Sequence, residues 1–228
     1  MEKADLSLKA VGKDIKLLYS DKDIAVCVKP AGMLSEGDSH DAMPYLLSKT
    51  LGRGVYTVHR LDRETEGVMV YAKNSEAAAY LSAQIGDGTF KKEYLAVTSG
   101  IPDEKEGKIK SLLFYDRAAR KTFCVKRKRQ GVKEALLSYN VIGETEDLAL
   151  LKIRLYTGRT HQIRAQFSSK GLPLLGDRRY GAPKTEYNGI ALVAYRLSFV
   201  HPKIGSELSF TYTPRLEEYP WSLFEGGI

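Results

Sequence analysis

The sequence has few cysteines and few histidines. Its 228 residues include two cysteines, Cys27 and Cys124, and four histidines. Two cysteines that do not lie in a CxxC pair exclude a disulfide framework and a zinc or redox motif of that kind. No two of the histidines lie within five residues of each other, so the close spacing of a typical histidine metal site is also missing. We therefore expect no metal site.

Long hydrophobic runs are absent as well. No stretch approaches the 18 apolar residues that a membrane-spanning helix needs. The first residues, MEKADLSLKAVGKD, lack the apolar core of 7–15 residues that a signal peptide contains. These two absences, together with the low cysteine content, predict a cytoplasmic protein that does not associate with membranes.

Repeats, low-complexity tracts and long linkers are also missing from the chain. Hydrophobic residues make up 43% and charged residues 28%, which excludes intrinsic disorder, collagen and a coiled coil as descriptions of the whole chain. A chain of this length buries roughly 70–75% of its unfolded surface, so it can build a core without a disulfide or metal. We expect a single catalytic domain over residues 1–228, built as two lobes that share a sheet, with residues 1–20 as an N-terminal extension of uncertain order. We expect it to be a monomer.

Positive charge is in excess. There are 35 Lys and Arg against 28 Asp and Glu, a net charge of +7. The stretch from Arg117 to Arg129 holds seven basic residues in thirteen. A second cluster comprises Arg154, Arg159, Arg164, Lys170, Arg178 and Arg179. Such clusters fit a nucleic-acid partner, although a solvated basic face is the alternative explanation.

Patterns of apolar residues predict an α+β fold. Strands are expected at 23–28, 56–58, 68–72, 94–98, 108–114, 121–126, 135–142, 148–155, 190–200 and 207–212, and helices at 41–51, 77–85, 160–169 and, for a short final one, around 216–223. We expect Gly86 to end the second helix and Thr160 to cap the third. Strand clusters with interposed helices and no regular βαβ rhythm favour a mixed, largely antiparallel sheet with flanking helices.

A polar loop over residues 59–67, with the sequence HRLDRETEG, separates two of these strands. Asp62 lies between Arg60 and Arg63, so its ionised form should be favoured. An ionised Asp can act as a nucleophile or base. A strand cap held by a salt bridge is the alternative explanation.

A second polar segment, residues 157–164 with the sequence TGRTHQIR, combines a glycine turn with the start of a predicted helix. A helix N-terminus beside Arg159 favours an anion such as a phosphate or a carboxylate. Arg164, four residues after Thr160, should lie on the same face of that helix. A capped surface helix with a solvated arginine is the alternative.

The pattern His59-Arg60-Leu61-Asp62-x-x-Thr65-x-Gly67 resembles the central motif of the RluA family of pseudouridine synthases. Further segments resemble the other motifs of that family in the same order along the chain. They are KPAG at 29–32, KEYLA at 92–96, TGRTHQIR at 157–164, GLP at 171–173, GDRRY at 176–180 and LSFVHP at 197–202. The resemblance covers about residues 23–214.

This resemblance implies roles for particular residues. Asp62 corresponds to the catalytic aspartate, Tyr94 to the tyrosine that stacks on the uracil and is implicated in removing its C5 proton, and Arg164 to the basic residue that pairs with the aspartate. The same comparison implies that the substrate is bound by His59, Arg60, Arg63, Thr65, Thr160, Gln162 and Ile163. Arg60 would occupy or flank the space left by the flipped nucleotide, and Ile163 would pack under the base.

The family resemblance also implies the fold and the reaction. The fold would be the pseudouridine synthase fold, with an active-site cleft crossing the sheet. The enzyme would isomerise uridine to pseudouridine in structured RNA, ribosomal or transfer RNA, by breaking N1–C1′ and forming C5–C1′ on a base flipped out of its stack. The sequence leaves open whether Asp62 attacks C6, attacks C1′ or removes the C2′ proton. No step needs a metal, a nucleotide or another cofactor, so we expect none.

The sequence departs from the family pattern at several positions. Glu66 replaces a common serine, Gln166 replaces a common histidine, and Ala194-Tyr195 stands where His-Ala is common. These departures bear on substrate choice rather than on the matched catalytic positions. The S4 RNA-binding module of many relatives is also expected to be absent, because little sequence precedes the first motif.

Two other functions compete with this one. A hydrolase is disfavoured because the chain has no GxSxG elbow. A catalytically inactive RNA-binding protein on the same fold remains the alternative, and the presence of Asp62, Tyr94 and Arg164 argues against it.

Overall fold

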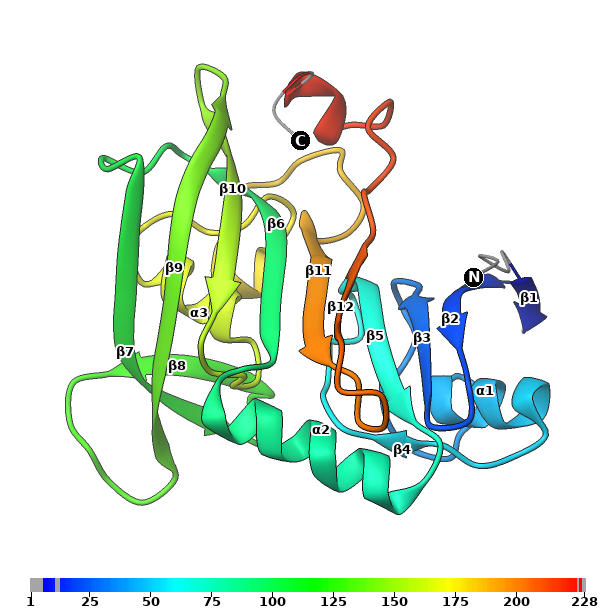
Figure 1. The fold of residues 1–228 in the computed structure, drawn as a ribbon. Coiled ribbons are helices and arrows are strands. Elements are labelled where there is room, and N and C mark those ends of the chain that lie inside the picture. Colours follow the sequence, from blue (N-terminus) through cyan, green and yellow to red (C-terminus); the bar gives the residue numbers. More distant parts are fainter. Residues whose placement is uncertain (1–5, 11–12, 225, 227–228) are drawn as a thin grey trace. The chain divides into compact units, whose positions relative to one another are not determined.

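The chain folds into two compact units. The computed structural model describes residues 6–10, 13–224 and 226. The first unit comprises Met1–Lys92 and Ala194–Tyr212, and the second comprises Glu93–Val193 and Thr213–Ile228. The chain enters the second unit after Lys92, returns to the first at Ala194 and leaves it again after Tyr212 (Figure 1). Each unit is therefore built from two segments that are distant in the sequence.

Most of the first unit is an antiparallel sheet with two helices. The strands follow the order β1-β2-β3-β5-β11, and β4 and β12 pair with β5 and β11. The elements are β1 (Leu6–Ala10), β2 (Lys13–Ser20), β3 (Ile24–Lys29), α1 (Met43–Leu51), β4 (Tyr56–Thr57), β5 (Glu66–Ala72), α2 (Ser75–Asp87), β11 (Leu192–Val200) and β12 (Glu207–Thr211). The first two residues of β11 belong to the second unit.

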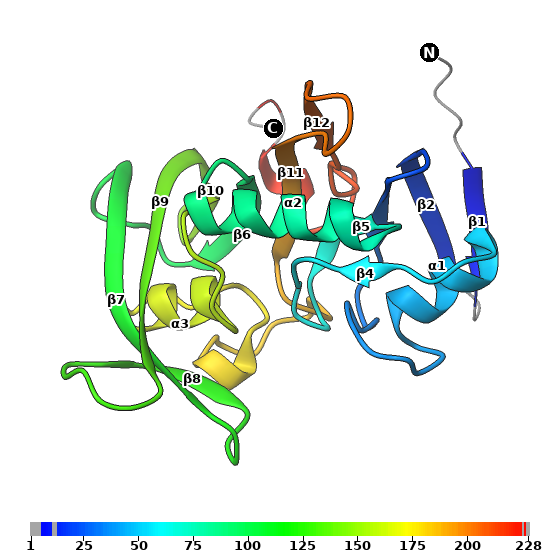
Figure 2. The same ribbon diagram turned by 60° about the horizontal axis from the view of Figure 1, so that its bottom comes forward.

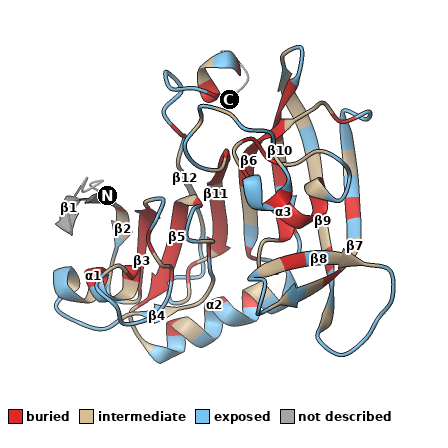
Figure 3. Ribbon diagram, turned by 180° about the vertical axis from the view of Figure 1, so that it is seen from behind, coloured by how far each residue is buried: buried red, intermediate tan, exposed pale blue. Residues whose placement is uncertain are grey.

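Strands β3 and β5 form the centre of the first unit. They pair antiparallel from Ile24 opposite Ala72 to Lys29 opposite Gly67, and almost all of their residues are buried (Figure 3). Burial on both faces explains why the sequence of β3 is an apolar run rather than an alternating pattern. Cys27 lies in this run, and burial raises the pKa of its thiol to about 12 against the opposing effect of the Lys29 charge.

Helix α2 covers part of this sheet and has well-formed ends. The side chain of Asn74 accepts a hydrogen bond from the amide of Ala77 at 2.8 Å, which satisfies one of the free amides at the helix N-terminus. The buried face carries Ala77 and Leu81, which pack in the core with Phe90 and with residues of β3, β5 and β11. Figure 2 shows α2 beside β4.

The second unit contains a largely antiparallel sheet. Its strands follow the order β6-β10-β9-β7-β8. The elements are β6 (Lys91–Ser99), β7 (Glu106–Asp116), β8 (Lys121–Val125), β9 (Val132–Glu144), β10 (Leu148–Leu155), α3 (Gln162–Ser168) and the 3-10 turns η1 (Arg178–Tyr180) and η2 (Trp221–Phe224). Helix α3 packs against β7 and β8, and Ala165 meets Leu113, Ala135 and Tyr180 in a buried cluster.

The predicted fold class is confirmed, because the sheet is largely antiparallel and the helices are few. No helix in the described ranges is long and apolar enough to cross a membrane. The expected N-terminal extension contains β1 and β2, which the pattern analysis did not predict. Residues 1–5 and 11–12 of that extension lie outside the described residues.

Three predictions about the helices are wrong. Helix α2 passes through Gly86 and ends at Asp87, and its C-cap is Gly88, which has a φ of 82° and donates its amide to the carbonyl of Gln84. Thr160 does not cap α3, because the helix begins at Gln162 and the capping position is His161 with a φ of 51°. The expected final helix is only the 3-10 turn η2, since Pro220 provides no amide hydrogen within that segment.

Two glycines of the first unit give opposite predictions. An added Cβ at Gly67 would lie 2.3 Å from the carbonyl oxygen of Ala194, and its φ is 133°. Gly86 sits on the exposed side of α2 with nothing near its Cβ position. We expect Gly67→Ala to lower the free energy of unfolding by about 3 kcal/mol. The control Gly86→Ala should raise it by about 0.5–1 kcal/mol.

Urea unfolding of the two variants and the wild type measures both changes. Equal stability of Gly67→Ala and the wild type would show that the strands can separate at this contact.

Candidate active site

The predicted catalytic residues are divided between the two units. Asp62 lies in the first unit, while Tyr94 and Arg164 lie in the second. Each unit holds its own part of the site through buried polar contacts.

The ammonium group of Lys29 ties together two loops of the first unit. Its side chain is completely buried at the end of β3. It donates hydrogen bonds to the carbonyl oxygens of Pro30, Met33 and Arg63 at 3.0, 2.9 and 3.1 Å. A buried ammonium must be satisfied in this way, because leaving it without acceptors costs several kcal/mol. The loop that follows β3 and the loop that carries Asp62 are thereby held at a fixed distance.

Arg63 strengthens the same connection. Its Nε donates to the carbonyl of Gly32 at 3.0 Å, and its Nη2 forms an ion pair with Asp41 at 3.1 Å. The amide of Gly32 in turn donates to the carbonyl of Arg63 at 2.7 Å. Arg63, predicted to bind substrate, therefore fastens the KPAG loop to the Asp62 loop.

Asp62 lies in a turn that is anchored on both sides. Ahead of it, the hydroxyl of the buried Ser35 donates to the carbonyl of Leu61 at 2.9 Å. After it, the amide of Thr65 donates to the carbonyl of Asp62 at 3.1 Å, and the Thr65 side chain is buried. The side chain of Asp62 remains partly exposed. A carboxylate on a fixed backbone with access to solvent can reach a bound substrate in one defined geometry.

The two arginines beside Asp62 pair with other carboxylates. Arg60 forms an exposed ion pair with Glu36 at 3.1 Å, and the partner of Arg63 is Asp41. The expectation that these arginines favour the ionised form of Asp62 stays a prediction.

His59 has a structural position. Its Nε2 accepts a hydrogen bond from the amide of Val70 at 3.1 Å, and its ring lies 5.4 Å from that of Phe90. Burial, with a smaller contribution from the charge of Lys92, lowers the pKa of His59 to about 3. The ring is thus neutral, with its proton on Nδ1. Its contacts are those of a core histidine, and the substrate-binding role stays a prediction.

Glu66 is hydrogen-bonded to the hydroxyl of Tyr212. Next to it, Gly67 lies directly against Ala194, at one of the positions where the sequence departs from the family pattern. The amide of Tyr212 also donates to the carbonyl of Tyr195 at 2.8 Å. The unusual residues Glu66, Ala194 and Tyr195 therefore belong to one local group, in which Tyr212 holds the additional carboxylate.

In the second unit, Arg164 is held by Asp177. The carboxylate accepts from Nε and Nη2 of Arg164 at 2.7 and 3.0 Å, and both side chains are almost completely buried. The guanidinium also lies 5.0 Å from the centre of the Tyr180 ring. A bidentate ion pair of this kind fixes the orientation of the guanidinium and neutralises its charge. The expected pairing of Arg164 with Asp62 stays a prediction.

The loop before α3 is ordered by Gln162. Its Oε1 accepts from the hydroxyl of Thr157 and the amide of Arg159, and its Nε2 donates to the carbonyl of Leu136. Thr160 contributes its carbonyl, which accepts from the hydroxyl of Thr122. The side chain of Gln162 thus supports the loop. The helix has seven residues, and the predicted anion site at its N-terminus stays a prediction.

Tyr94 and Ile163 are buried in the second unit. Tyr94 lies on β6 with 6% of its surface exposed, and Ile163 lies in the first turn of α3 with 3% exposed. Gln166, which replaces a common histidine, is also buried and donates to the carbonyl of Ile109 and the hydroxyl of Ser111. This departure from the family pattern therefore serves the packing of α3 against β7.

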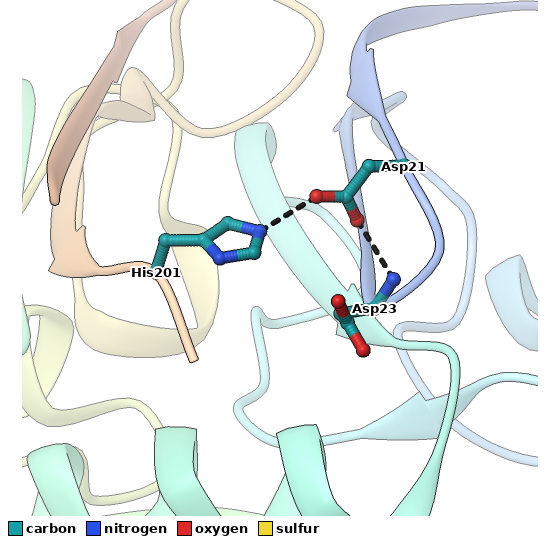
Figure 4. Close-up of side chains that lie close together, drawn as sticks. All are labelled: Asp21, Asp23 and His201. Carbon is teal, nitrogen blue, oxygen red and sulfur yellow. Dashed lines mark hydrogen bonds and ion pairs between the residues drawn. The ribbon is translucent and has the colours of Figure 1, made fainter. Parts of the chain in front are cut away.

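Among the described residues, one group of carboxylates and a histidine has ligand atoms close enough together to hold a metal ion: Asp21, Asp23 and His201 (Figure 4). Their ligand atoms are already used. Nε2 of His201 bonds to Asp21 at 2.6 Å, while its Nδ1 accepts from two amides of its own turn. Burial disfavours the charge of Asp21, yet hydrogen bonds from the amides of Ile24 and Asp23 give it a lowered pKa. The group is a hydrogen-bonded junction between β2, β3 and the end of β11.

Sequence reasoning missed three supporting residues: Lys29, Asp177 and Tyr180. All three lie in motifs that the sequence shares with the family, but no role was assigned to them. The sequence pattern that could have identified them is a polar side chain directly beside a glycine or proline: Lys29 precedes Pro30, Asp177 follows Gly176 and Tyr180 precedes Gly181.

The neutral state of His59 predicts a pH dependence of stability. Its pKa is about 3 in the fold and 6.5 in an ordinary setting. Between these values the unfolded chain binds the proton more readily, so stability falls as the pH decreases, by up to ~1.4 kcal/mol per pH unit. We expect the stability of the wild type relative to His59→Gln to shrink at this rate from pH 6.5 downwards in urea unfolding.

His40→Gln, at an exposed histidine, is the control for the loss of one imidazole. A wild-type advantage over His59→Gln that did not change with pH would contradict a neutral His59.

Comparisons with known proteins agree with the motifs. A family model described as RNA pseudouridylate synthase matches residues 23–169. An Aquifex aeolicus protein described as an uncharacterised RNA pseudouridine synthase is 36% identical, over 92% of this chain and 72% of its own. A Zymomonas mobilis protein named ribosomal large subunit pseudouridine synthase D is 32% identical, over 92% of this chain and 70% of its own.

The fold is also similar to solved structures. Human RNA pseudouridylate synthase domain containing 4 has a TM-score of 0.72 and 26% identity, and the match covers 88% of this chain and 89% of that one. With a family pattern matched over most of its length and relatives above 30% identity along nearly all of it, this chain belongs to the RluA-type RNA pseudouridine synthases, which are enzymes.

Proposed function

We propose that the enzyme isomerises a specific uridine in structured RNA, with Asp62 as the catalytic carboxylate and the target base flipped out of its stack. The observation that carries this proposal is the anchoring of the Asp62 turn. Buried contacts fix Leu61, Arg63 and Thr65, while the Asp62 side chain itself keeps access to solvent. A catalytic group needs such a preorganised backbone, because a displacement of about 1 Å can cost 10²-fold in rate.

The reaction moves one glycosidic bond and one proton. The N1–C1′ bond breaks, the uracil turns within the site, and C5 bonds to C1′. The proton on C5 is then lost and N1 gains one, so the product is an isomer of the substrate. Asp62 acts in the first stage by attacking C6, attacking C1′ or removing the C2′ proton, and in each case it must be ionised.

Tyr94 and Arg164 supply the remaining functions. Tyr94 would stack on the uracil and take part in removing the C5 proton. Arg164 would stabilise the charge of Asp62, and its own orientation is set by Asp177. Arg60, which has an exposed side chain, would flank the space left by the flipped nucleotide. Base flipping costs a few kcal/mol in a duplex and less in a loop, so a loop uridine is the favoured target.

Ribosomal RNA is the favoured substrate class over transfer RNA. Relatives from Zymomonas mobilis and Borreliella burgdorferi, both 32% identical to this chain, carry the name ribosomal large subunit pseudouridine synthase D. We propose that the enzyme acts in the cytoplasm as a monomer, without a nucleotide or other cofactor.

The first prediction for this function concerns Asp62→Asn. The amide keeps the size of the side chain but removes its charge and nucleophilic oxygen. We expect release of tritium from RNA labelled at uridine C5 to fall below a few per cent of the wild type, while thermal unfolding and RNA affinity are retained. Asp38→Asn, which removes an exposed carboxylate from the neighbouring loop, should leave tritium release unchanged.

Substantial turnover by Asp62→Asn would remove Asp62 from the mechanism. An inactive RNA-binding protein predicts a different result, because the wild type itself would then bind the RNA without releasing tritium.

The second prediction concerns Tyr94→Phe. The variant keeps the aromatic ring for stacking and loses only the hydroxyl, so RNA affinity should stay within about twofold of the wild type. If the hydroxyl takes part in proton removal, kcat should fall by about 10²- to 10⁴-fold. Tyr45→Phe, at an exposed tyrosine of α1, is the matched control. A wild-type kcat in Tyr94→Phe would assign the proton transfer to another group.

A further inference from the structure

Two non-glycine residues of the described chain have positive φ angles, Arg120 at 48° and His161 at 51°. A side chain in this conformation raises the energy of the backbone, and glycine avoids most of that cost. Both residues adjoin the 3-10 turn η1 of the second unit. Arg179 donates to the carbonyl of Arg120 at 2.8 Å, and Nδ1 of His161 lies 3.0 Å from the hydroxyl of Tyr180. Strained residues of this kind often mark functional sites.

The hairpin turn between β7 and β8 does not need an arginine at position 120. Asp116 pairs with Lys121 at the base of the turn, and its Oδ1 accepts from the amides of Ala118 and Ala119 at 2.9 and 3.0 Å. The backbone is therefore ordered by Asp116. Within the described part of the chain, the guanidinium of Arg120 makes no hydrogen bond or ion pair, and its side chain is exposed. Glycine would suit the turn better, so packing does not explain the arginine.

Positive charge gathers around this turn. We define the β7–β8 tip surface by its five basic residues: Arg117, Arg120, Lys121, Arg178 and Arg179. The four arginines are exposed, and the Lys121 ammonium lies 5.0 Å from the centre of the Tyr180 ring. Of the nearby acids, Asp177 is neutralised by Arg164, and Asp116 accepts from backbone amides and keeps its charge. The tip surface therefore carries five basic residues against one nearby carboxylate that has no cationic partner in the described chain.

Exposed aromatic rings lie next to these charges. Tyr115 is 39% exposed and Phe123 is 41% exposed, and they flank the hairpin turn in sequence. Lys121 lies over the Phe123 ring at 5.6 Å. Arginines that bind phosphates and aromatic rings that stack on bases are the combination found on RNA-binding surfaces, whereas an acidic protein would need only the charge. Figure 2 shows this hairpin at the end of β7 and β8.

We propose that the β7–β8 tip surface binds phosphates of the RNA substrate outside the target nucleotide, and that Arg120 is kept in its unfavourable backbone conformation for this contact. The inference rests on the proposed RNA substrate. It adds to that function a second contact region, which determines affinity and register rather than the chemical step.

The test uses three substitutions at position 120 in the full chain. Arg120→Gly removes the charge and relieves the backbone, Arg120→Ala removes the charge alone, and Arg120→Lys keeps the charge. We measure thermal unfolding, and the affinity for a fluorescein-labelled RNA hairpin over a range of salt concentrations. Arg120→Gly and Arg120→Ala should bind roughly sixfold more weakly at 0.1 M salt, with the slope of log affinity against log salt reduced by about 0.7–0.9.

The remaining outcomes separate charge from structure. Arg120→Lys should recover the wild-type slope, and Arg120→Gly should unfold at or above the wild-type temperature although it binds RNA more weakly. A merely structural role for Arg120 predicts instead that the more stable variant binds as well as the wild type. Lys22→Gln, an equal loss of charge between β2 and β3, is the control and should leave the slope unchanged.

Two results would overturn the inference: an unchanged salt slope in Arg120→Gly, or a lower unfolding temperature of that variant than of the wild type. Weakened binding of polyglutamate with unchanged RNA binding would assign the surface to an acidic protein. Arg117→Gln, in the same turn, repeats the test of charge at a residue without a positive φ, and it should reduce the salt slope as well. Failure of the proposed function is distinct, since it is the absence of tritium release by the wild type.

Discussion

The buried ammonium group of Lys29 is the interaction on which the first half of the site depends. It lies at the last position of β3, opposite Gly67 of β5, and donates to three carbonyl oxygens in two loops. Since water does not reach it, these carbonyls replace its hydration, and neither loop can move away without exposing an unsatisfied charge. The close approach of Gly67 to Ala194 also restricts the start of β5, because only a residue without a side chain fits against the backbone of Ala194.

In the second unit, a buried ion pair holds Arg164 in place. Arg164 and Asp177 neutralise each other inside the core, and Tyr180 lies against the guanidinium while its hydroxyl accepts from the amide of Thr122. Burial raises the pKa of that hydroxyl, against the lowering effect of the Thr122 hydrogen bond, so it remains protonated. Each unit thus contains a buried cation whose charge is satisfied within that unit, Lys29 in the first and Arg164 in the second.

Much of the fold followed from local sequence patterns. The strand predicted at 148–155 coincides with β10, and the pairing of β3 with β5 places the expected apolar runs in the core. Errors arose where a tertiary contact decides the outcome. Gly86 can continue a helix whereas Gly88 closes it with a hydrogen bond, and His161 occupies a left-handed position that is uncommon for any residue other than glycine. Strand β2 was not predicted because its sequence lacks a regular alternation of apolar and polar residues, and its pairing with β3 shifts register between Leu17 and Tyr19.

For the site, the sequence identified the motif residues but not their partners. Glu36 and Asp41, which pair with Arg60 and Arg63, lie in the loop after β3, and only the fold brings them there. The roles of Lys29 and Asp177 depend on complete burial of a charge, which no local pattern reports.

The two cysteines differ in their access to solvent. Cys27 is sealed in the β3 core with a thiol pKa of about 12, so it stays unreactive towards alkylating reagents at neutral pH. Cys124 on β8 is only partly buried, but it packs against the cluster that contains Ala165, and its thiol donates to the carbonyl of Ala165 at 3.6 Å. The access of a reagent to Cys124 therefore depends on how tightly α3 packs against β8.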